Sequence, residues 1–328
     1  MALYPCYLAQ PPANQFEIPI QSHELTPQIS LLQSWDFVTA APPPPNHGFR
    51  PSPPNPLLIF TPSVAGKYPV LLFCHGFYLR NSFYSNLLEH IASHGYIVVA
   101  PQFYDWIPIS GTTEISYAAK VTDWLSEGLQ PLLPDNVKAD LLKLALSGHS
   151  RGGKTAFALA LGHAKTKLKF SVLLGIDPVA GSSKNSRIFP HILTYVPHSF
   201  NLSIPVTVIG TGLGPEKANC CSPACAPDGV NHKEFYNECK EPCSYFVAKD
   251  YGHMDMLDDN PPGIVGELSG CMCKNGIYPR DLMRRTVGGL VVAVLKASLK
   301  SEDGDFKAIV NDPALAPAKL DPVEFVAA

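Results

Sequence analysis

Short apolar runs alternate with segments of helical spacing along most of this chain. The runs are rich in Val, Leu and Ile and predict strands buried on both faces, as in a parallel sheet. They lie at residues 57–60, 68–74, 96–100, 141–146, 170–175, 204–210 and 244–248. Segments with apolar residues at helical spacing lie between and after them, at 82–93, 114–129, 154–161 and 280–299. This alternation predicts an α/β fold with a mostly parallel central sheet and helices on both faces, its last strand at 244–248 and its closing helix at 280–299.

The first 55 residues differ in composition from the rest. Proline clusters at 42–45 and again within 51–56, and proline has no backbone N–H to contribute to a sheet. We therefore expect residues 1–55 to form an arm that is irregular or partly strand, with strands for example near 15–20 and 35–40. Residues 56–328 are expected to form one catalytic domain with a cysteine-rich insertion around 211–243.

Charge and hydropathy narrow the choice of partners. The net charge of −3 over 328 residues lacks the basic footprint that nucleic-acid binding needs. No run of 18 apolar residues occurs, so we expect no membrane-spanning helix. The first 50 residues contain a single basic residue, Arg50, and begin without a charged and then apolar segment, so neither a transit peptide nor a signal peptide is expected.

The segment 148–153 reads Gly-His-Ser-Arg-Gly-Gly and joins a predicted strand to a predicted helix. A G-x-S-x-G sequence in this context is typical of a tight turn that exposes a strained serine above a sheet edge. Gly148 and Gly152 would let the helix pack closely on the strand. We expect Ser150 to be a nucleophile, since its alternative role as a helix N-cap leaves the flanking glycines unexplained.

A nucleophilic serine needs a histidine base, and the histidine needs an acid. His253 lies just after the last predicted strand and follows a glycine, which favours it over His232 in the cysteine-rich insertion. Asp177 lies at the carboxyl end of the strand after the predicted elbow helix, within an apolar run that makes an unpartnered acid costly. Glu216, after the next strand, is the alternative acid. The predicted order of serine, acid and histidine is typical of the α/β-hydrolase fold.

Ester chemistry also needs N–H donors for the oxyanion. One should be the backbone N–H of Arg151, directly after the nucleophile. The other should come from the loop after the strand that ends at Cys74, where we assign the backbone N–H of Phe77. His75 in that loop is expected only to shape the turn.

Seven of the nine cysteines lie within residues 220–273. Disulfides, which imply an oxidising compartment, reduced thiols and a zinc site with His232 all remain open. The spacings C-C-x3-C, C-x3-C and C-x-C do not match the C-x2-C pairs usual for zinc. We expect no metal site and no cofactor.

Several segments together resemble the plant chlorophyllases. They comprise residues 81–85, 93–102, 147–158, 175–179 and 251–259, and the likeness extends from about residue 52 to about residue 299. In this resemblance the family's serine, aspartate and histidine fall on Ser150, Asp177 and His253. The family's fold would be that of the α/β-hydrolases.

The resemblance implies hydrolysis of the phytyl ester of chlorophyll to chlorophyllide and phytol, without a cofactor. Apolar side chains in the loops expected near the site would suit such a substrate, although each could equally cover the core. Those we assign to substrate binding are Tyr78, Phe83, Tyr84, Tyr104, Trp106 and Met254. The substrate also suggests a plastid and peripheral contact with a membrane, while the cysteines suggest the secretory route, and the cytosol stays open as a third compartment. A general carboxylesterase or lipase, or a binder that has lost turnover, are the alternatives.

Overall fold

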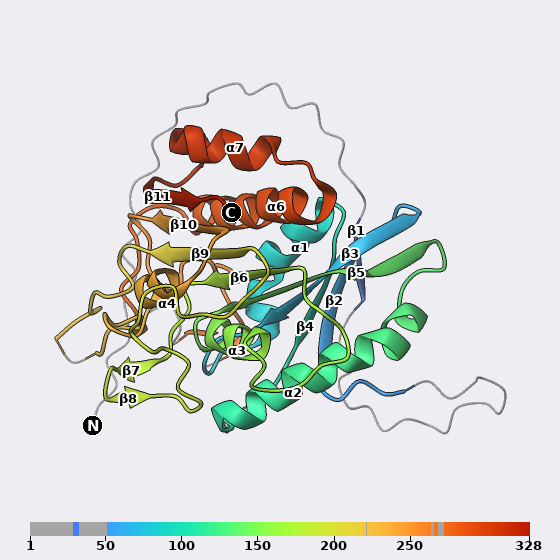
Figure 1. Cartoon of the computed structure of the whole chain (residues 1–328), viewed down its shortest axis with the longest axis horizontal. Coiled ribbons are helices and arrows are strands. Elements are labelled where there is room, and N and C mark those ends of the chain that lie inside the picture. Colours follow the sequence, from blue (N-terminus) through green and yellow to red (C-terminus); the bar gives the residue numbers. More distant parts are fainter. Residues whose placement is uncertain (1–28, 33–50, 106, 221, 264–265, 268–271) are drawn as a thin grey trace.

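The computed structural model describes residues 29–32 and 51–328, apart from 106, 221, 264–265 and 268–271. A nine-stranded sheet runs through the described part, in the order β1-β2-β4-β3-β5-β6-β9-β10-β11 (Figure 1). Its strands are β1 (Ile29–Leu32), β2 (Leu57–Pro62), β3 (Gly66–Cys74), β4 (Ile97–Pro101), β5 (Val137–His149), β6 (Val172–Ile176), β9 (Val206–Thr211), β10 (Cys243–Ala248) and β11 (Leu320–Val326). From β4 to β10 every neighbouring pair is parallel, and the outer pairs are antiparallel. The predicted mostly parallel sheet is confirmed.

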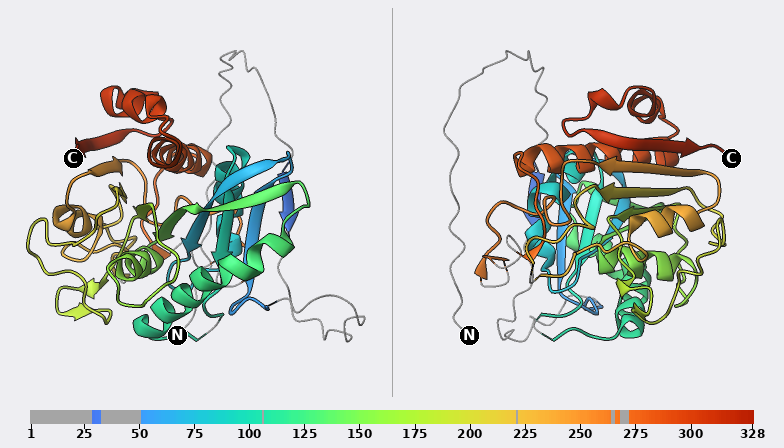
Figure 2. Two further views of the ribbon diagram at one scale, coloured as in Figure 1. Left: turned by 45° about the vertical axis from the view of Figure 1, so that its right-hand side comes forward. Right: turned by 90° about the vertical axis from the view of Figure 1, so that its left-hand side faces the viewer.

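Helices cover both faces of the sheet (Figure 2). They are α1 (Ser85–Ser93), α2 (Gly111–Trp124), α3 (Arg151–Ala160), α4 (His232–Glu238), α6 (Arg280–Lys300) and α7 (Gly304–Asn311). Alternate residues of each strand point to opposite faces. On β3, Val70 and Leu72 join the core cluster that holds α2, α3 and α4, whereas Leu71 and Phe73 join the cluster that holds α1 and α6. Two apolar cores therefore sandwich the sheet.

The two ends of the chain depart from the sequence prediction. The strand at 244–248 is not the last one and the helix at 280–299 does not close the fold, because α7 and the antiparallel strand β11 follow them. Strand β1 adds an antiparallel edge at the other side, outside the ranges we expected for the arm. Those ranges, 15–20 and 35–40, lie outside the described residues.

The carboxyl ends of the central strands are level with one another. Cys74 at the end of β3 pairs with Gly148, which pairs in turn with Gly175, and Ile176 pairs with Ile209. Because parallel strands end at the same edge, the loops that follow them meet there. This edge carries the candidate site.

One disulfide joins Cys225, in the loop after β9, to Cys273, shortly before α6. It supports the disulfide interpretation for this pair. Within the described ranges no group of three or more His, Cys, Asp or Glu side chains is arranged to hold a metal ion. The described helices include none that combines the length and the hydropathy needed to cross a membrane.

Candidate active site

Ser150 occupies the turn between β5 and α3. Its φ of 58° and ψ of −125° are unusual for a residue with a side chain and cost about 1–3 kcal/mol. Glycine makes the turn passable: a Cβ on Gly152 would come within 2.2 Å of the Cys74 carbonyl oxygen, and one on Gly148 within 2.3 Å of the Gly152 oxygen. The backbone N–H of Ser150 bonds to the Ile176 oxygen at 3.0 Å and ties the turn to β6. The strained, tightly packed elbow that the sequence predicted is present.

Three side chains remote in sequence meet at this turn. His253 Nε2 lies 2.8 Å from Ser150 Oγ, and His253 Nδ1 lies 2.6 Å from Asp177 Oδ2. Asp177 directly follows β6, while His253 lies in the loop after β10. All three are buried, with 7%, 0% and 2% of the surfaces of Ser150, Asp177 and His253 exposed. An ionised carboxylate can only accept a hydrogen bond, so Nδ1–H of His253 donates to Asp177, and Nε2 carries the lone pair that faces the serine hydroxyl.

The carboxylate of Asp177 is held from several sides. Thr211 donates to it through its hydroxyl at 2.5 Å and through its backbone N–H at 3.3 Å. Burial, the largest influence, would raise the pKa of Asp177. Hydrogen bonds and charge from His253, with smaller help from His232 and Thr211, outweigh burial and lower the pKa to about 2. Asp177 is therefore ionised at neutral pH.

His232, the competing base, lies beside the acid, but the histidine bonded to the serine is His253. Its Nε2 lies 3.9 Å from Asp177 Oδ1, on the carboxylate oxygen that His253 does not use, and its Nδ1 is 2.7 Å from the Tyr245 hydroxyl. Burial lowers the pKa of His232 despite the nearby carboxylate. Glu216, the competing acid, is exposed in the loop after β9, and no hydrogen bond joins it to His253 within the described chain.

The two N–H groups assigned to the oxyanion flank the serine. Arg151 begins α3, so its N–H is among the free donors of a helix start. Phe77 follows Gly76, where a Cβ would come within 3.2 Å of Ser150 Cβ. Neither the Phe77 nor the Arg151 N–H donates to another residue of the described chain. His75 shapes this loop as expected, since its ring contacts the Gly76 oxygen at 2.9 Å and accepts the Phe103 N–H at 3.0 Å.

The side chain of Arg151 fixes the start of α3. Its Nε donates to Glu114 of α2 at 2.6 Å, and its guanidinium also donates to the Ile109 carbonyl oxygen. The guanidinium lies 5.2 Å from the centroid of the Phe77 ring and 5.9 Å from that of Tyr104. Through this one side chain α2 and the loop after β3 are held against the elbow.

The aromatic residues assigned to substrate binding divide into two groups. Phe83 and Tyr84 are entirely buried, so the prediction that they contact substrate is wrong: both lie in the core cluster that holds α1. Tyr104 and Met254 keep only 8% and 7% of their surface. Tyr78 is 43% exposed, beside Phe77, and can contact a ligand. Trp106 lies outside the described residues.

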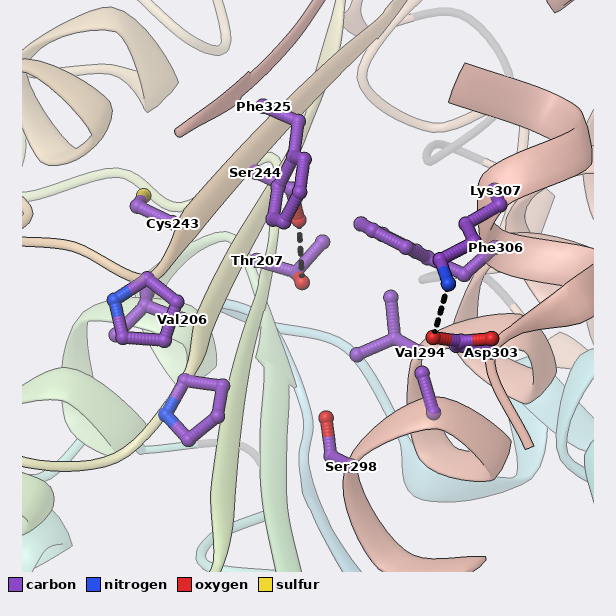
Figure 3. A pocket seen from close by; sticks show the side chains of 13 residues that line it. Val206, Thr207, Cys243, Ser244, Val294, Ser298, Asp303, Phe306, Lys307 and Phe325 are labelled. Atoms are coloured by element: carbon purple, nitrogen blue, oxygen red, sulfur yellow. Dashed lines mark hydrogen bonds and ion pairs between the residues drawn. The ribbon is translucent and has the colours of Figure 1, made fainter. Parts of the chain in front are cut away.

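A hollow of about 270 Å³ is lined by residues of β9, β10, β11, α6 and α7, some of which Figure 3 shows. It is lined by the first residues of β9 and β10, such as Val206 and Ser244, and by Phe306 of α7 and Phe325 of β11. The site occupies the carboxyl ends of the parallel strands. The hollow therefore opens at the opposite end of β9 and β10 and takes no part in the site.

Comparison with known proteins decides the family. The chlorophyllase family model matches residues 36–327. The chain belongs to the chlorophyllase family. It is 58% identical over 274 residues to Chlorophyllase-1 of Arabidopsis thaliana, covering 83% of this chain and 84% of that protein. It is 52% identical over 279 residues to a Citrus sinensis protein named Chlorophyllase-1, chloroplastic (84% and 82% covered), and 52% identical over 263 residues to Chlorophyllase-2 of A. thaliana (79% and 82%).

Family membership confirms the resemblance seen in the sequence. With the parallel sheet and its strained elbow, it places this chain among carboxylic-ester hydrolases of the α/β-hydrolase fold. The sequence did not reveal the buried groups around the three central residues, namely Thr211 and His232 beside Asp177, His149 beside His253, and Tyr84 bonded to His149. His149 stands inside the elbow motif itself, and that position was the one available signal.

Proposed function

We propose that this chain hydrolyses the ester that joins phytol to the ring propionate of chlorophyll, releasing chlorophyllide and phytol. The substrate is proposed from the family and from the names of its relatives. The chemistry is supported by one observation above all. His253 lies within hydrogen-bond distance of both Ser150 and Asp177, at 2.8 and 2.6 Å.

In the first half of the proposed reaction Ser150 Oγ attacks the ester carbonyl carbon while its proton passes to His253 Nε2. Asp177 is ionised and accepts Nδ1–H, so it stabilises the imidazolium as it forms. The carbonyl oxygen takes up negative charge and is bound by the N–H groups of Phe77 and Arg151. Collapse of this intermediate breaks the bond to phytol, whose oxygen takes the proton from His253.

The second half repeats these steps with water. His253 takes a proton from water, whose oxygen attacks the acyl carbon held on Ser150. The tetrahedral intermediate then expels the serine oxygen, which regains its proton from His253, and chlorophyllide leaves as the acid. Apart from the attacking water, these steps use side chains and backbone N–H groups of this chain.

For substrate contacts we propose Phe77 and Tyr78 first. Both are more than two-fifths exposed, their rings lie 4.4 Å apart between centroids, and they follow Gly76 beside the nucleophile. Exposed aromatic faces of this kind suit a flat macrocycle or an isoprenoid chain. Tyr104 and Met254 offer little surface and would contribute only if a loop moved.

We propose in addition that this edge touches lipid when the enzyme takes up its substrate. Ile107 is 80% exposed and lies in the segment between β4 and α2 that also carries Tyr104, and the guanidinium of Arg151 contacts both the Tyr104 and the Phe77 rings. An Ile107→Asp variant should sediment less with vesicles of plastid lipid than the wild type. Equal sedimentation of the two would contradict this proposal.

The decisive experiment compares wild-type protein with Ser150→Ala on two esters. Solvent partition separates chlorophyllide from chlorophyll, and a short p-nitrophenyl ester reports general esterase activity. Wild type should release chlorophyllide, and Ser150→Ala should lose at least about 10³-fold in kcat on both esters. Glu216→Gln, an exposed acid on the loop after β9, is the control and should keep wild-type rates.

The alternatives predict different results. A wild-type preference of a hundredfold in kcat/KM for short esters would favour a general carboxylesterase. A protein that binds chlorophyll but releases no chlorophyllide would be a binder. Unchanged hydrolysis by Ser150→Ala would exclude this serine as the nucleophile.

A further inference from the structure

A second histidine lies against the proposed base, and the mechanism above does not use it. His149 ends β5, is fully buried, and its ring centroid lies 4.6 Å from that of His253. Its Nε2 is 2.9 Å from the backbone carbonyl oxygen of His253, and its Nδ1 is 2.7 Å from the hydroxyl of Tyr84. That hydroxyl also receives the backbone N–H of Gly76 at 3.1 Å.

These hydrogen bonds form a series from Gly76 to His253, which we call the hydrogen-bond relay, and the direction of each of them is determined. A carbonyl oxygen only accepts, so His149 Nε2 carries its proton and donates it to His253. Burial, together with the charge of His253, lowers the pKa of His149 well below its ordinary value, so Nδ1 has no proton and accepts. Tyr84 must then donate its O–H to Nδ1 and accept the N–H of Gly76 on its oxygen. Each donor has one acceptor, from Gly76 through Tyr84 and His149 to His253.

The hydrogen-bond relay joins the two loops whose relative position matters most for the reaction. Gly76 precedes Phe77, which is proposed to bind the oxyanion, and His253 is the proposed base. Tyr84 is a rigid link, since it ends the 3-10 helix Asn81–Tyr84, has no exposed surface and packs edge-on against Phe73 with centroids 4.9 Å apart. His149 is the last residue of the central strand before Ser150.

We infer that Tyr84 and His149 are positioning residues. They fix the loop after β3, which carries Phe77, and the backbone of His253 relative to each other and to Ser150. The inference depends on the proposed function for the roles of Phe77 and His253. Tyr84 and His149 are both fully buried, so neither offers surface to a substrate. Their effect is on the geometry of groups that bind the transition state, where an error of about 1 Å can cost ~100-fold in rate.

The test removes a single oxygen. Tyr84→Phe keeps the ring in the core but leaves the Gly76 N–H and His149 Nδ1 without partners. We expect kcat to fall by about 10- to 100-fold with KM within about twofold of wild type, because transition-state contacts are affected more than substrate binding. A residue that only fills the core would lower the melting temperature and leave the kcat of the folded fraction unchanged.

Another tyrosine of this protein, Tyr96, supplies a matched control. Tyr96 belongs to the same core cluster and is equally buried, and its hydroxyl has no hydrogen-bond partner among the residues that the structure describes. Tyr96→Phe therefore removes the same atom from the same core and should leave both kcat and KM unchanged. Equal kinetics for Tyr84→Phe and wild type, or equal losses in Tyr84→Phe and Tyr96→Phe, would overturn the inference.

Variants of His149 provide a second measurement. The amide of His149→Gln can still donate to the carbonyl of His253, whereas His149→Leu cannot, so Gln should retain more kcat than Leu. Combined with Tyr84→Phe, His149→Leu should cost less than the product of the two single losses, because both break the hydrogen-bond relay. Multiplicative losses would separate the two residues and contradict a common role.

The short ester keeps this test independent of the substrate proposal. If wild type hydrolyses the short ester but not chlorophyll, the proposed substrate is wrong, while the Tyr84 comparison still decides the inference. If wild type hydrolyses chlorophyll and Tyr84→Phe matches it, the function stands and the inference fails. A wild type that hydrolyses neither ester would overturn both.

Discussion

At the scale of single residues, the buried carboxylate of Asp177 links catalysis to stability. Its pKa is about 2 in the folded protein, below the ordinary value of 3.8. Between these values the unfolded chain binds a proton that the folded one does not, so stability rises with pH through this window. Asp177 thus contributes about 2 kcal/mol that is present above pH 4 and is lost as the pH falls towards 2.

Asp177→Asn tests both properties. The amide cannot hold the tautomer of His253 that leaves Nε2 free, so kcat should fall by about 10⁴-fold. Urea unfolding between pH 4 and pH 2 should show the variant losing about 2 kcal/mol less stability than wild type over that range. Identical pH slopes would show that the charge of Asp177 is not what the fold stabilises. A mild kinetic loss here, with a severe one in Glu216→Gln, would reassign the acid.

Ser150, Asp177 and His253 could be predicted because the ends of apolar strands and a serine flanked by glycines can be recognised in the sequence alone. Their partners were not visible for a physical reason. Tyr84 and Phe83 occur in a loop-to-helix transition where spacing alone does not say which aromatic side chain turns inward, and both were wrongly given to the substrate. His232 was set aside because it lies in the cysteine-rich insertion, yet α4 brings it to the second oxygen of Asp177.

At the scale of elements, the approach of α3 to the ends of β3 and β5 determines the geometry of the site. Gly152 is the closest point, and a Cβ there would overlap the carbonyl oxygens of Cys74 and His75 at 2.2 and 2.4 Å. Backbone atoms cannot swing aside as a side chain can. The helix would have to move away from the strands, and Ser150 with it.

Gly152→Ala should therefore destabilise the protein by more than about 2 kcal/mol and reduce the kcat of whatever folds. Gly289 is the matched control, since it is also a helical glycine, but beyond the neighbouring backbone of its own helix no atom of the described residues lies within 4 Å of its Cβ position. Gly289→Ala should stabilise by about 0.5–1 kcal/mol through helix propensity. Thermal unfolding and kcat measured on both variants check the pair, and a tolerated Gly152→Ala would mean that the elbow is not tightly packed.

Central elements were predictable and edge elements were not. Buried parallel strands such as β4 consist of apolar residues alone, which makes them conspicuous. Strand β11 is largely exposed, contains Pro322, and pairs with β10 on one side, so neither a continuous run nor an alternation marks it. What defines it is its partner, some 70 residues earlier in the chain, as the register of Ala248 with Leu320 shows.

At the scale of the whole molecule, the disulfide between Cys225 and Cys273 restrains the part of the chain that carries the base. It spans 48 residues, and His253 lies within that span, together with α4 and β10. Cross-linking a loop of this length removes unfolded-state entropy worth about 4 kcal/mol. The same link limits how far the loop of His253 can move from Ser150.

Replacing both cysteines by alanine should lower the free energy of unfolding by about 4 kcal/mol under non-reducing conditions, as measured by urea titration. The kcat of the folded variant should change little, because the hydrogen bonds of His253 to Asp177 and Ser150 remain. Repeating the titrations with a reductant supplies the control, since any other disulfide is then lost from both proteins alike. In reductant, the difference in the free energy of unfolding between wild type and the variant should shrink to the effect of replacing the two cysteine side chains. A difference that persists in reductant would assign the loss to packing around the buried Cys273 instead of the cross-link.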